Sequence, residues 1–199
     1  MASTLRHLTP SDYVTTRWSG GATTQLAIFP PAAVYGDRTF LWRISSATVE
    51  LPASEFTALP DYERFLSTLR GDIRISHDGG APISLSPGSI HRFDGGAATR
   101  SQGLCTDFNL MLRKGACTGQ MRTLRLAENG SARLARTMDP PAGGVHTLVL
   151  YCAEGDGAVE SDSGAAALLA GEAALVENGE PLLRCRAASA FYLCELVHG

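Results

Sequence analysis

Short runs of alternating apolar and polar residues dominate the chain and predict β-strands. The clearest runs span residues 39–49 (TFLWRISSATV), 71–77, 106–112, 145–151 and 190–197. Glycine, proline, aspartate and asparagine interrupt these runs often, as they do in turns. Helical periodicity is scarce, and only residues 62–69 (YERFLSTL) fit a helical turn or two as well as a strand. The pattern therefore predicts an all-β protein, built as an antiparallel sandwich or barrel.

An internal repeat indicates that this β-structure occurs twice. The segment around Gly71 can be laid over the segment around Gly155 at an offset of 83 or 84 residues, and three pairs of glycines then coincide. These pairs are Gly71 with Gly155, Gly88 with Gly171, and Gly95 with Gly179. Such glycines suit turns that need a positive φ. We therefore expect two similar antiparallel β-barrels, over residues 1–115 and 116–199, that form one compact unit.

Composition and charge argue against several classes of protein. The formal net charge is −3, with 17 basic and 20 acidic residues, so no nucleic-acid surface is expected. The chain shows neither a leader-like start nor an apolar stretch of membrane-spanning length, which predicts a cytoplasmic protein without a membrane partner. Five cysteines without a CxxC pair fit reduced, buried thiols better than a disulfide framework or a zinc site.

The glycine pair in residues 17–26 (RWSGGATTQL) fits a turn better than a phosphate-binding loop. A P-loop needs a longer glycine run that ends in lysine and opens a helix, whereas here no lysine is present and a strand is predicted to follow. The turn would place Thr23 and Gln25 on one face of that strand.

Two further predicted strands each carry closely spaced polar side chains on one face. Alternation places Arg43 and Ser45 on one face of the first, and Asp107 and Asn109 on one face of the second. If these strands are neighbours, their polar side chains form one pocket, with Arg43 and Arg64 as anchors for an anionic small molecule. The alternative is that one face of the sheet is solvated and that Asp107 forms a plain cross-strand ion pair with Arg43.

The strand, turn and "L-x-P-G" pattern of residues 69–96 resembles the cupin superfamily. That resemblance implies RmlC-like jelly-roll barrels, which usually hold a metal through an HxH pair, a glutamate and a further histidine. The five histidines include no HxH pair, and only His91 lies near the position of a ligand. Arg64 lies in the segment where the early ligands are expected. We therefore expect no metal and no cofactor.

A more specific resemblance is to the HutD/Ves family of two-cupin (bicupin) proteins. Five segments carry it in the family's order: WSGGATTQL (18–26), FLWRISSATVE (40–50), SEFTALPDYERFLSTLRGD (54–72), HRFDGG (91–96) and TDFNLM (106–111). Beyond residue 112 only the repeat supports the interpretation, and we expect the C-terminal half to be mainly structural. Many members have a glutamate where this chain has Gln25.

The family resemblance implies a set of pocket residues and a role. Members often accompany histidine-utilisation genes, and their proposed role is to bind a small acid such as formylglutamate and so regulate the pathway. The ligand-binding candidates that follow are Trp18, Gly20, Gly21, Thr23, Gln25, Arg43, Ser45, Arg64, Phe93, Asp107 and Asn109.

Two functional classes follow from these residues. The favoured class is a binding or regulatory protein that holds a small carboxylate, as a monomer or a homodimer. The alternative is a metal-independent cupin enzyme, an isomerase or hydrolase of a small organic acid. Such an enzyme needs a group that moves a proton, and the candidates are Asp107, Tyr62 and His91. No ordered set of nucleophile, histidine and carboxylate is evident.

Overall fold

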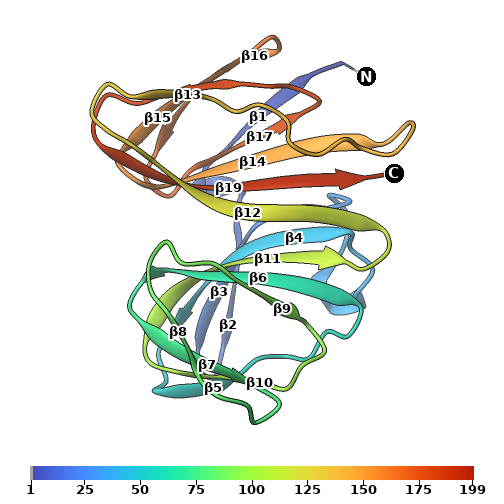
Figure 1. Ribbon diagram of the computed structural model, residues 1–199, viewed down its shortest axis with the longest axis vertical. Coiled ribbons are helices and arrows are strands. Elements are labelled where there is room, and N and C mark those ends of the chain that lie inside the picture. The colour runs from blue at the N-terminus through green and yellow to red at the C-terminus, as the bar shows by residue number, and fades with distance from the viewer. Residues whose placement is uncertain (1) are drawn as a thin grey trace. The chain divides into compact units, whose positions relative to one another are not determined.

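The computed structural model describes residues 2–199, and they form an all-β structure of two compact units (Figure 1). One unit is Tyr13–Gly115, and the other combines residues 2–12 with Ala116–Gly199. All five long runs predicted as strands are strands in the structure. The ambiguous segment 62–69 is also a strand, because it pairs on both sides within a sheet.

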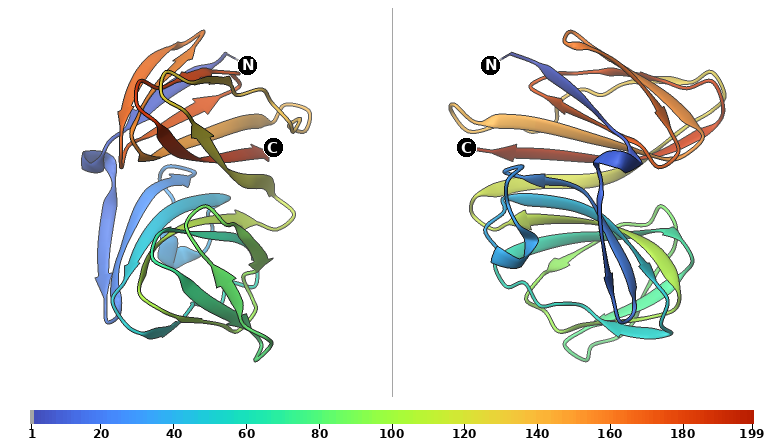
Figure 2. Two further views of the ribbon diagram at one scale, coloured as in Figure 1. Left: turned by 60° about the vertical axis from the view of Figure 1, so that its left-hand side comes forward. Right: turned by 180° about the vertical axis from the view of Figure 1, so that it is seen from behind.

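The Tyr13–Gly115 unit contains two antiparallel sheets that face each other (Figure 1), and Figure 2 shows the same two layers from two more sides. The larger sheet has the order β2-β3-β4-β11-β6-β9 and the smaller one the order β5-β10-β7-β8. A single-turn helix, η2, precedes β4. The bounds are β2 Val14–Trp18, β3 Gly21–Phe29, η2 Tyr35–Asp37, β4 Trp42–Val49, β5 Ala53–Glu55, β6 Tyr62–Arg70, β7 Ile73–His77, β8 Ile83–Leu85, β9 His91–Asp94, β10 Thr99–Gln102 and β11 Cys105–Arg113.

The other unit also contains two antiparallel sheets. Their orders are β1-β17-β14-β19-β12 and β13-β18-β15-β16. The bounds are β1 Thr4–Leu8, η1 Pro10–Asp12, β12 Cys117–Leu126, β13 Ser131–Arg133, β14 Val145–Glu154, β15 Asp156–Ser161, β16 Gly164–Leu169, β17 Ala173–Glu177, β18 Leu182–Arg184 and β19 Ser189–His198.

The two units repeat one topology, as the sequence repeat predicted. The order β4-β11-β6-β9 corresponds to β12-β19-β14-β17, and β5-β10-β7-β8 corresponds to β13-β18-β15-β16. Two of the three repeated glycine pairs have matching positive φ angles, with +78° at Gly71 and +80° at Gly155, and +89° at Gly88 and +94° at Gly171. The third pair, Gly95 and Gly179, does not have a positive φ. Within residues 2–199 the sheets are open, with edge strands, so two closed barrels are not what the structure describes.

The expected boundary at residue 115 is present, but residues 2–12 belong to the unit that contains the C-terminal half and not to the N-terminal half. Strand β1 pairs antiparallel with β17 over five residues, from Thr4 opposite Glu177 to Leu8 opposite Ala173. Leu8 is buried. The N-terminal strand therefore completes a sheet of the unit that contains the C-terminus.

Each unit has an apolar core between its sheets. In the Tyr13–Gly115 unit, Leu66 of β6, Ile75 of β7 and Phe93 of β9 belong to one cluster. In the other unit, Leu148 and Leu150 of β14 pack with Leu183 of β18 and Phe191 of β19. All five cysteines are buried and none is paired in a disulfide, so the expected burial of these residues is confirmed.

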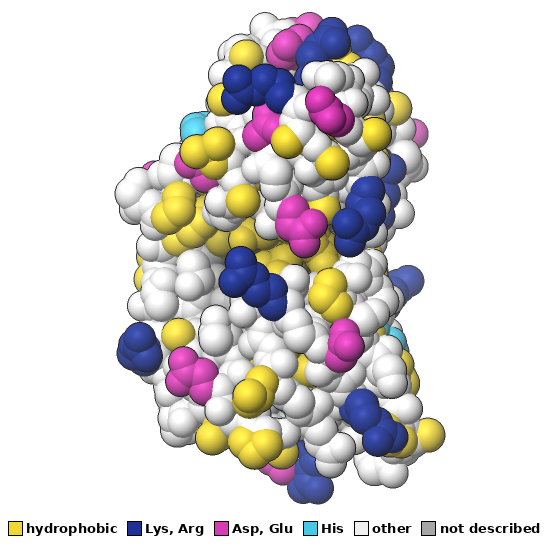
Figure 3. Space-filling view, turned by 90° about the vertical axis from the view of Figure 1, so that its left-hand side faces the viewer, with side chains coloured by type: hydrophobic (Ala, Val, Ile, Leu, Met, Phe, Trp, Pro, Cys, Tyr) yellow, Lys and Arg dark blue, Asp and Glu magenta, His cyan; other side chains and the backbone are white. Residues whose placement is uncertain are grey.

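Two further observations concern the charged side chains on one face and the length of the helices. On the face shown in Figure 3, basic and acidic side chains are interspersed. Within residues 2–199, no helix has the length and apolar character needed to cross a bilayer.

Candidate functional site

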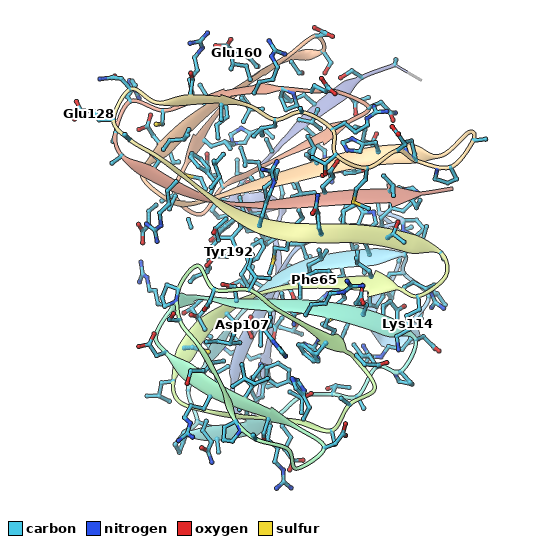
Figure 4. The ribbon with its side chains drawn as sticks, viewed as in Figure 1. Phe65, Asp107, Lys114, Glu128, Glu160 and Tyr192 are labelled. Carbon is cyan, nitrogen blue, oxygen red and sulfur yellow. The ribbon has the colours of Figure 1, made fainter. Side chains whose placement is uncertain are left out.

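A cavity of about 380 Å³ lies within the Tyr13–Gly115 unit. Six of its polar side chains come from four strands of the larger sheet: Thr23 of β3, Arg43 and Ser45 of β4, Arg64 of β6, and Asp107 and Asn109 of β11. Figure 4 labels Asp107 within this unit, below strand β11 in that view. The remaining wall is formed by β2, by η2, by residues 54–57 and by apolar side chains of β4 and β11. These contribute Thr16, Arg17, Trp18, Tyr35, Ala47, Val49, Ser54, Glu55, Phe56, Thr57 and Met111.

The strand register explains why the two arginines reach the same cavity. Met111 of β11 lies directly opposite Arg43 on one neighbouring strand and Arg64 on the other. Directly opposed residues of antiparallel strands project from the same face of a sheet. Because strands are about 4.8 Å apart, the two arginine backbones are separated by roughly 10 Å, with β11 between them. Both guanidinium groups can therefore reach one small ligand.

Arg43 is held in place by polar and aromatic contacts. Its Nε donates to Oε1 of Gln25 at 2.8 Å, and Nη1 donates to Oγ of Ser45 at 3.0 Å. Its guanidinium lies 4.3 Å from the ring centroid of Tyr35, and the guanidinium of Arg38 lies 3.9 Å from the same centroid. Burial lowers the pKa of Arg43, but an arginine remains charged after such a shift.

Arg64 has aromatic neighbours and an unsatisfied donor. Its guanidinium lies 4.9 Å from the ring centroid of Phe56 and 5.3 Å from that of Phe93. Its Nε is buried and has no hydrogen-bond partner in the part of the chain that the structure describes. Burial lowers the pKa of Arg64 to about 10, so the group is cationic at neutral pH. Unsatisfied buried donors are uncommon in proteins, and this one belongs to a charged group.

Asp107 lies in the same cavity without forming an ion pair. Its Oδ1 accepts a hydrogen bond from the backbone N–H of Ala47 at 2.9 Å. Among residues 2–199, no basic group forms a salt bridge with Asp107 within 4.0 Å, so the predicted alternative of a plain pair with Arg43 is wrong. Burial raises the pKa of Asp107 to about 6, although the Ala47 N–H and the two arginines act in the opposite direction.

The face that carries these groups is closed to solvent. Arg43, Arg64, Asp107 and Asn109 are each 5 % exposed, and Ser45 is 2 % exposed. The alternative of an ordinary solvated sheet face is therefore wrong. Oδ1 of Asn109 is also buried without a hydrogen-bond partner among the described residues. The cavity thus presents an unsatisfied donor and an unsatisfied acceptor.

The structure brings seven of the predicted binding residues together at the cavity wall: Trp18, Thr23, Arg43, Ser45, Arg64, Asp107 and Asn109. Gln25 lies behind Arg43 as its hydrogen-bond acceptor, and Phe93 lies behind Arg64. Neither of these two lines the cavity itself. Both act on the site through an arginine.

Gly20 and Gly21 do not line the cavity. Gly21 has a φ of +147°, and a Cβ at that position would lie 1.9 Å from the carbonyl oxygen of Thr48. A Cβ at Gly20 would lie 2.1 Å from the ring of Trp18. The glycine pair is thus a turn that allows close approach to β4, as the sequence indicated, and it leaves room for the Trp18 ring.

Two of the proposed proton-transfer residues lie elsewhere. The hydroxyl of Tyr62 lies 2.9 Å from the carbonyl oxygens of Arg38 and Phe40, and Tyr62 is 1 % exposed. Nε2 of His91 lies 2.9 Å from Nε2 of His77. Neither Tyr62 nor His91 lines the cavity, so of the three candidates only Asp107 is placed there.

Sequence reasoning missed the walls that come from outside the regular strands. Tyr35 lies in η2, and Phe56 lies in the connection after β5. Alternation gives no information about such segments, so no signal in the sequence pointed to the stacking of Tyr35 on Arg43 or of Phe56 on Arg64. Within the described residues, no group of three or more histidine, cysteine, aspartate and glutamate side chains is placed to hold a metal.

Three of the equivalent positions in the other unit are apolar. At the offset of 84 residues, Arg64 corresponds to Leu148, and the register matches Asp107 with Phe191 and Asn109 with Leu193. These three residues are buried in the core of that unit: Leu148, Phe191 and Leu193. At these three positions the cavity of the Tyr13–Gly115 unit therefore has polar side chains where the repeat has apolar core.

Comparison with known proteins agrees with this architecture. The family model for HutD matches residues 10–193. The conserved protein of unknown function PA5104 from Pseudomonas aeruginosa PAO1 superimposes with a TM-score of 0.81 at 22% identity, covering 96% of this chain and 98% of its own. HutD from Pseudomonas fluorescens SBW25 has a TM-score of 0.72 at 20% identity, with coverages of 96% and 97%.

A more distant structure has the same general fold. The cupin 2 conserved barrel domain protein from Leptotrichia buccalis has a TM-score of 0.58 at 10% identity, and the match covers 98% of this chain and 96% of that protein. Among curated proteins, none matches the chain. The family match spans most of the sequence, and it includes every strand that positions the cavity. The chain therefore belongs to the HutD family.

Proposed function

We propose that the protein binds a small organic carboxylate in the cavity between Arg43 and Arg64, and that it acts as a binding or regulatory protein. The observation that carries this proposal is the buried Arg64, whose Nε has no acceptor among the described residues. A bound carboxylate would supply that acceptor and would also offset the charge of two arginines held away from water.

The charges around the cavity favour an anion. Arg17 adds a third cation at the rim. Glu55, which also lines the cavity, is paired with Arg100 at 2.9 Å and so adds little net negative charge. Asp107 is the remaining acid, and burial already opposes its ionisation. The summed charge therefore attracts small acids.

Family membership suggests which acids to test first. We propose formylglutamate, or a similar acid of histidine utilisation, as the regulatory ligand. Gln25 stands where many members have a glutamate, and this difference leaves room for a different acid. The duplicated strand order and the likeness to a cupin barrel protein support the further proposal that the chain is a bicupin, with the ligand in one half only.

The proposal is tested by thermal melts with formylglutamate, glutamate, urocanate and formate. A ligand at a hundredfold excess over its Kd stabilises the folded state by about 2.7 kcal/mol, so a binding acid should raise the Tm clearly. Arg64→Ala should abolish the shift. Arg74→Ala is the matched control, because Arg74 is an exposed residue of β7 in the same unit. The absence of a shift with every acid would contradict anion binding.

A further inference from the structure

The cavity also contains two hydrogen-bond acceptors, beside the arginines. Asp107 and Asn109 lie two residues apart on β11 and line the cavity together. Oδ1 of Asn109 has no partner in the described chain, and the carboxylate of Asp107 accepts one hydrogen bond, from Ala47 N–H. A cavity wall that contains both arginine donors and these acceptors fits a ligand with both kinds of group.

A plain carboxylate would meet a difficulty in this cavity. It would bring a second negative charge next to Asp107, which no arginine contacts as an ion pair within 4.0 Å. Like charges in a buried site repel strongly. The oxygen of Asn109 would remain unsatisfied as well.

Two events would relieve this repulsion. The ligand can donate a hydroxyl or N–H group to Asp107 or Asn109, so that the acceptors are satisfied. Otherwise Asp107 must take up a proton when the anion enters. Burial already raises the pKa of Asp107 to about 6, so proton uptake is accessible near neutral pH.

No other group around Asp107 would relieve the repulsion by changing its own charge. From β4 and β6 it faces Arg43 and Arg64, and from β11 it faces Asn109 and the thiol of Cys105, whose pKa is raised to about 12 and which is therefore neutral. Thr23 of β3 and Tyr35 of η2 carry hydroxyl groups in the cavity wall, and Arg17 and Glu55 also line it. Asp107 is therefore the group that responds to the incoming charge.

We propose that the cavity selects carboxylic acids that carry a hydroxyl or N–H donor, with Asp107 and Asn109 as the specificity-determining acceptors. This inference rests on the proposed carboxylate binding. An acid that lacks such a donor binds with uptake of a proton, and its affinity falls as the pH rises above about 6.

Calorimetric titration of butyrate and of its 2-, 3- and 4-hydroxy derivatives at pH 7.5 tests this selectivity. A hydrogen bond to a charged acceptor is worth about 1.5–3 kcal/mol, so at least one hydroxy acid should bind roughly 10- to 100-fold more tightly than butyrate. Titrations in phosphate and in Tris count the protons exchanged. The protein should take up close to one proton when butyrate binds, and close to none when the favoured hydroxy acid binds.

The variant Asp107→Asn removes the negative charge of this side chain and keeps its size and shape. It should raise the affinity for butyrate, remove the proton uptake and reduce the discrimination between the two acids. Asp72→Asn, an exposed change in the same unit, should change none of these. Equal affinities of wild-type protein for butyrate and for all three hydroxy acids would overturn the selectivity, whether or not the variant folds. If no acid binds, the proposed carboxylate binding itself fails.

Discussion

At position 25 an amide, and not a carboxylate, holds the guanidinium of Arg43. Oε1 of Gln25 accepts the Arg43 Nε–H at 2.8 Å, which fixes the direction of the guanidinium. Because the amide is neutral, it does not cancel the positive charge that faces the cavity. A glutamate at this position would form an ion pair with Arg43 and would compete with any bound anion.

Gln25→Glu should therefore weaken acid binding by about tenfold, which corresponds to about 1.4 kcal/mol. Calorimetry with the acid that gives the largest thermal shift measures this change. Gln102→Glu is the matched control, since it adds the same charge at an exposed position of β10. Equal affinity of the Gln25 variant and wild-type protein would mean that Arg43 does not hold the anion.

At the scale of single elements, alternation predicted the strands that form the floor of the site and the faces on which Arg43 and Asp107 lie. It worked there because one face of each strand is buried, and burial imposes a period of two. It could not predict Tyr35 or Phe56, whose positions depend on how η2 and the connection after β5 fold back over the strands. It left β6 undecided, since eight residues of mixed pattern do not distinguish a short strand from a helical turn.

The turn between β2 and β3 is an element that the backbone constrains tightly. Gly21→Ala should destabilise the protein by several kcal/mol, because its Cβ would lie 1.9 Å from Thr48 O at a φ of +147°. Urea denaturation measures this loss. Gly36→Ala is the control, because a Cβ at Gly36 meets no atom within 4 Å. Wild-type stability of the Gly21 variant would contradict the close approach of this turn to β4.

At the scale of the whole molecule, two copies of one topology have diverged in their interiors. The copy over Tyr13–Gly115 has Arg64, Asp107 and Asn109 where the other has Leu148, Phe191 and Leu193. Buried charges without close partners lower stability, so the cavity is maintained at the expense of the free energy of folding of its unit. This difference supports our expectation that the C-terminal copy is mainly structural.

Replacing the polar residues of the cavity by the apolar residues of the other unit should raise stability and abolish binding. The triple variant Arg64→Leu, Asp107→Phe and Asn109→Leu should lose all acid binding and unfold at a higher urea concentration, with a gain of about 1–4 kcal/mol. Arg64→Leu alone should lower stability, since it removes one of the two cations that face the buried Asp107 and leaves only Arg43. A triple variant that is less stable than this single variant would show that the two interiors are not interchangeable.

The pairing of β1 with β17 has a consequence for the order of events during synthesis. Thr4 must find Glu177, which leaves the ribosome more than 170 residues later. At about 5–20 residues per second, the first strand waits roughly 9–35 s for its partner, whereas every strand of the Tyr13–Gly115 unit is complete well before then. The half that contains the cavity can therefore fold during translation, while the other half closes only when the last part of the chain has emerged.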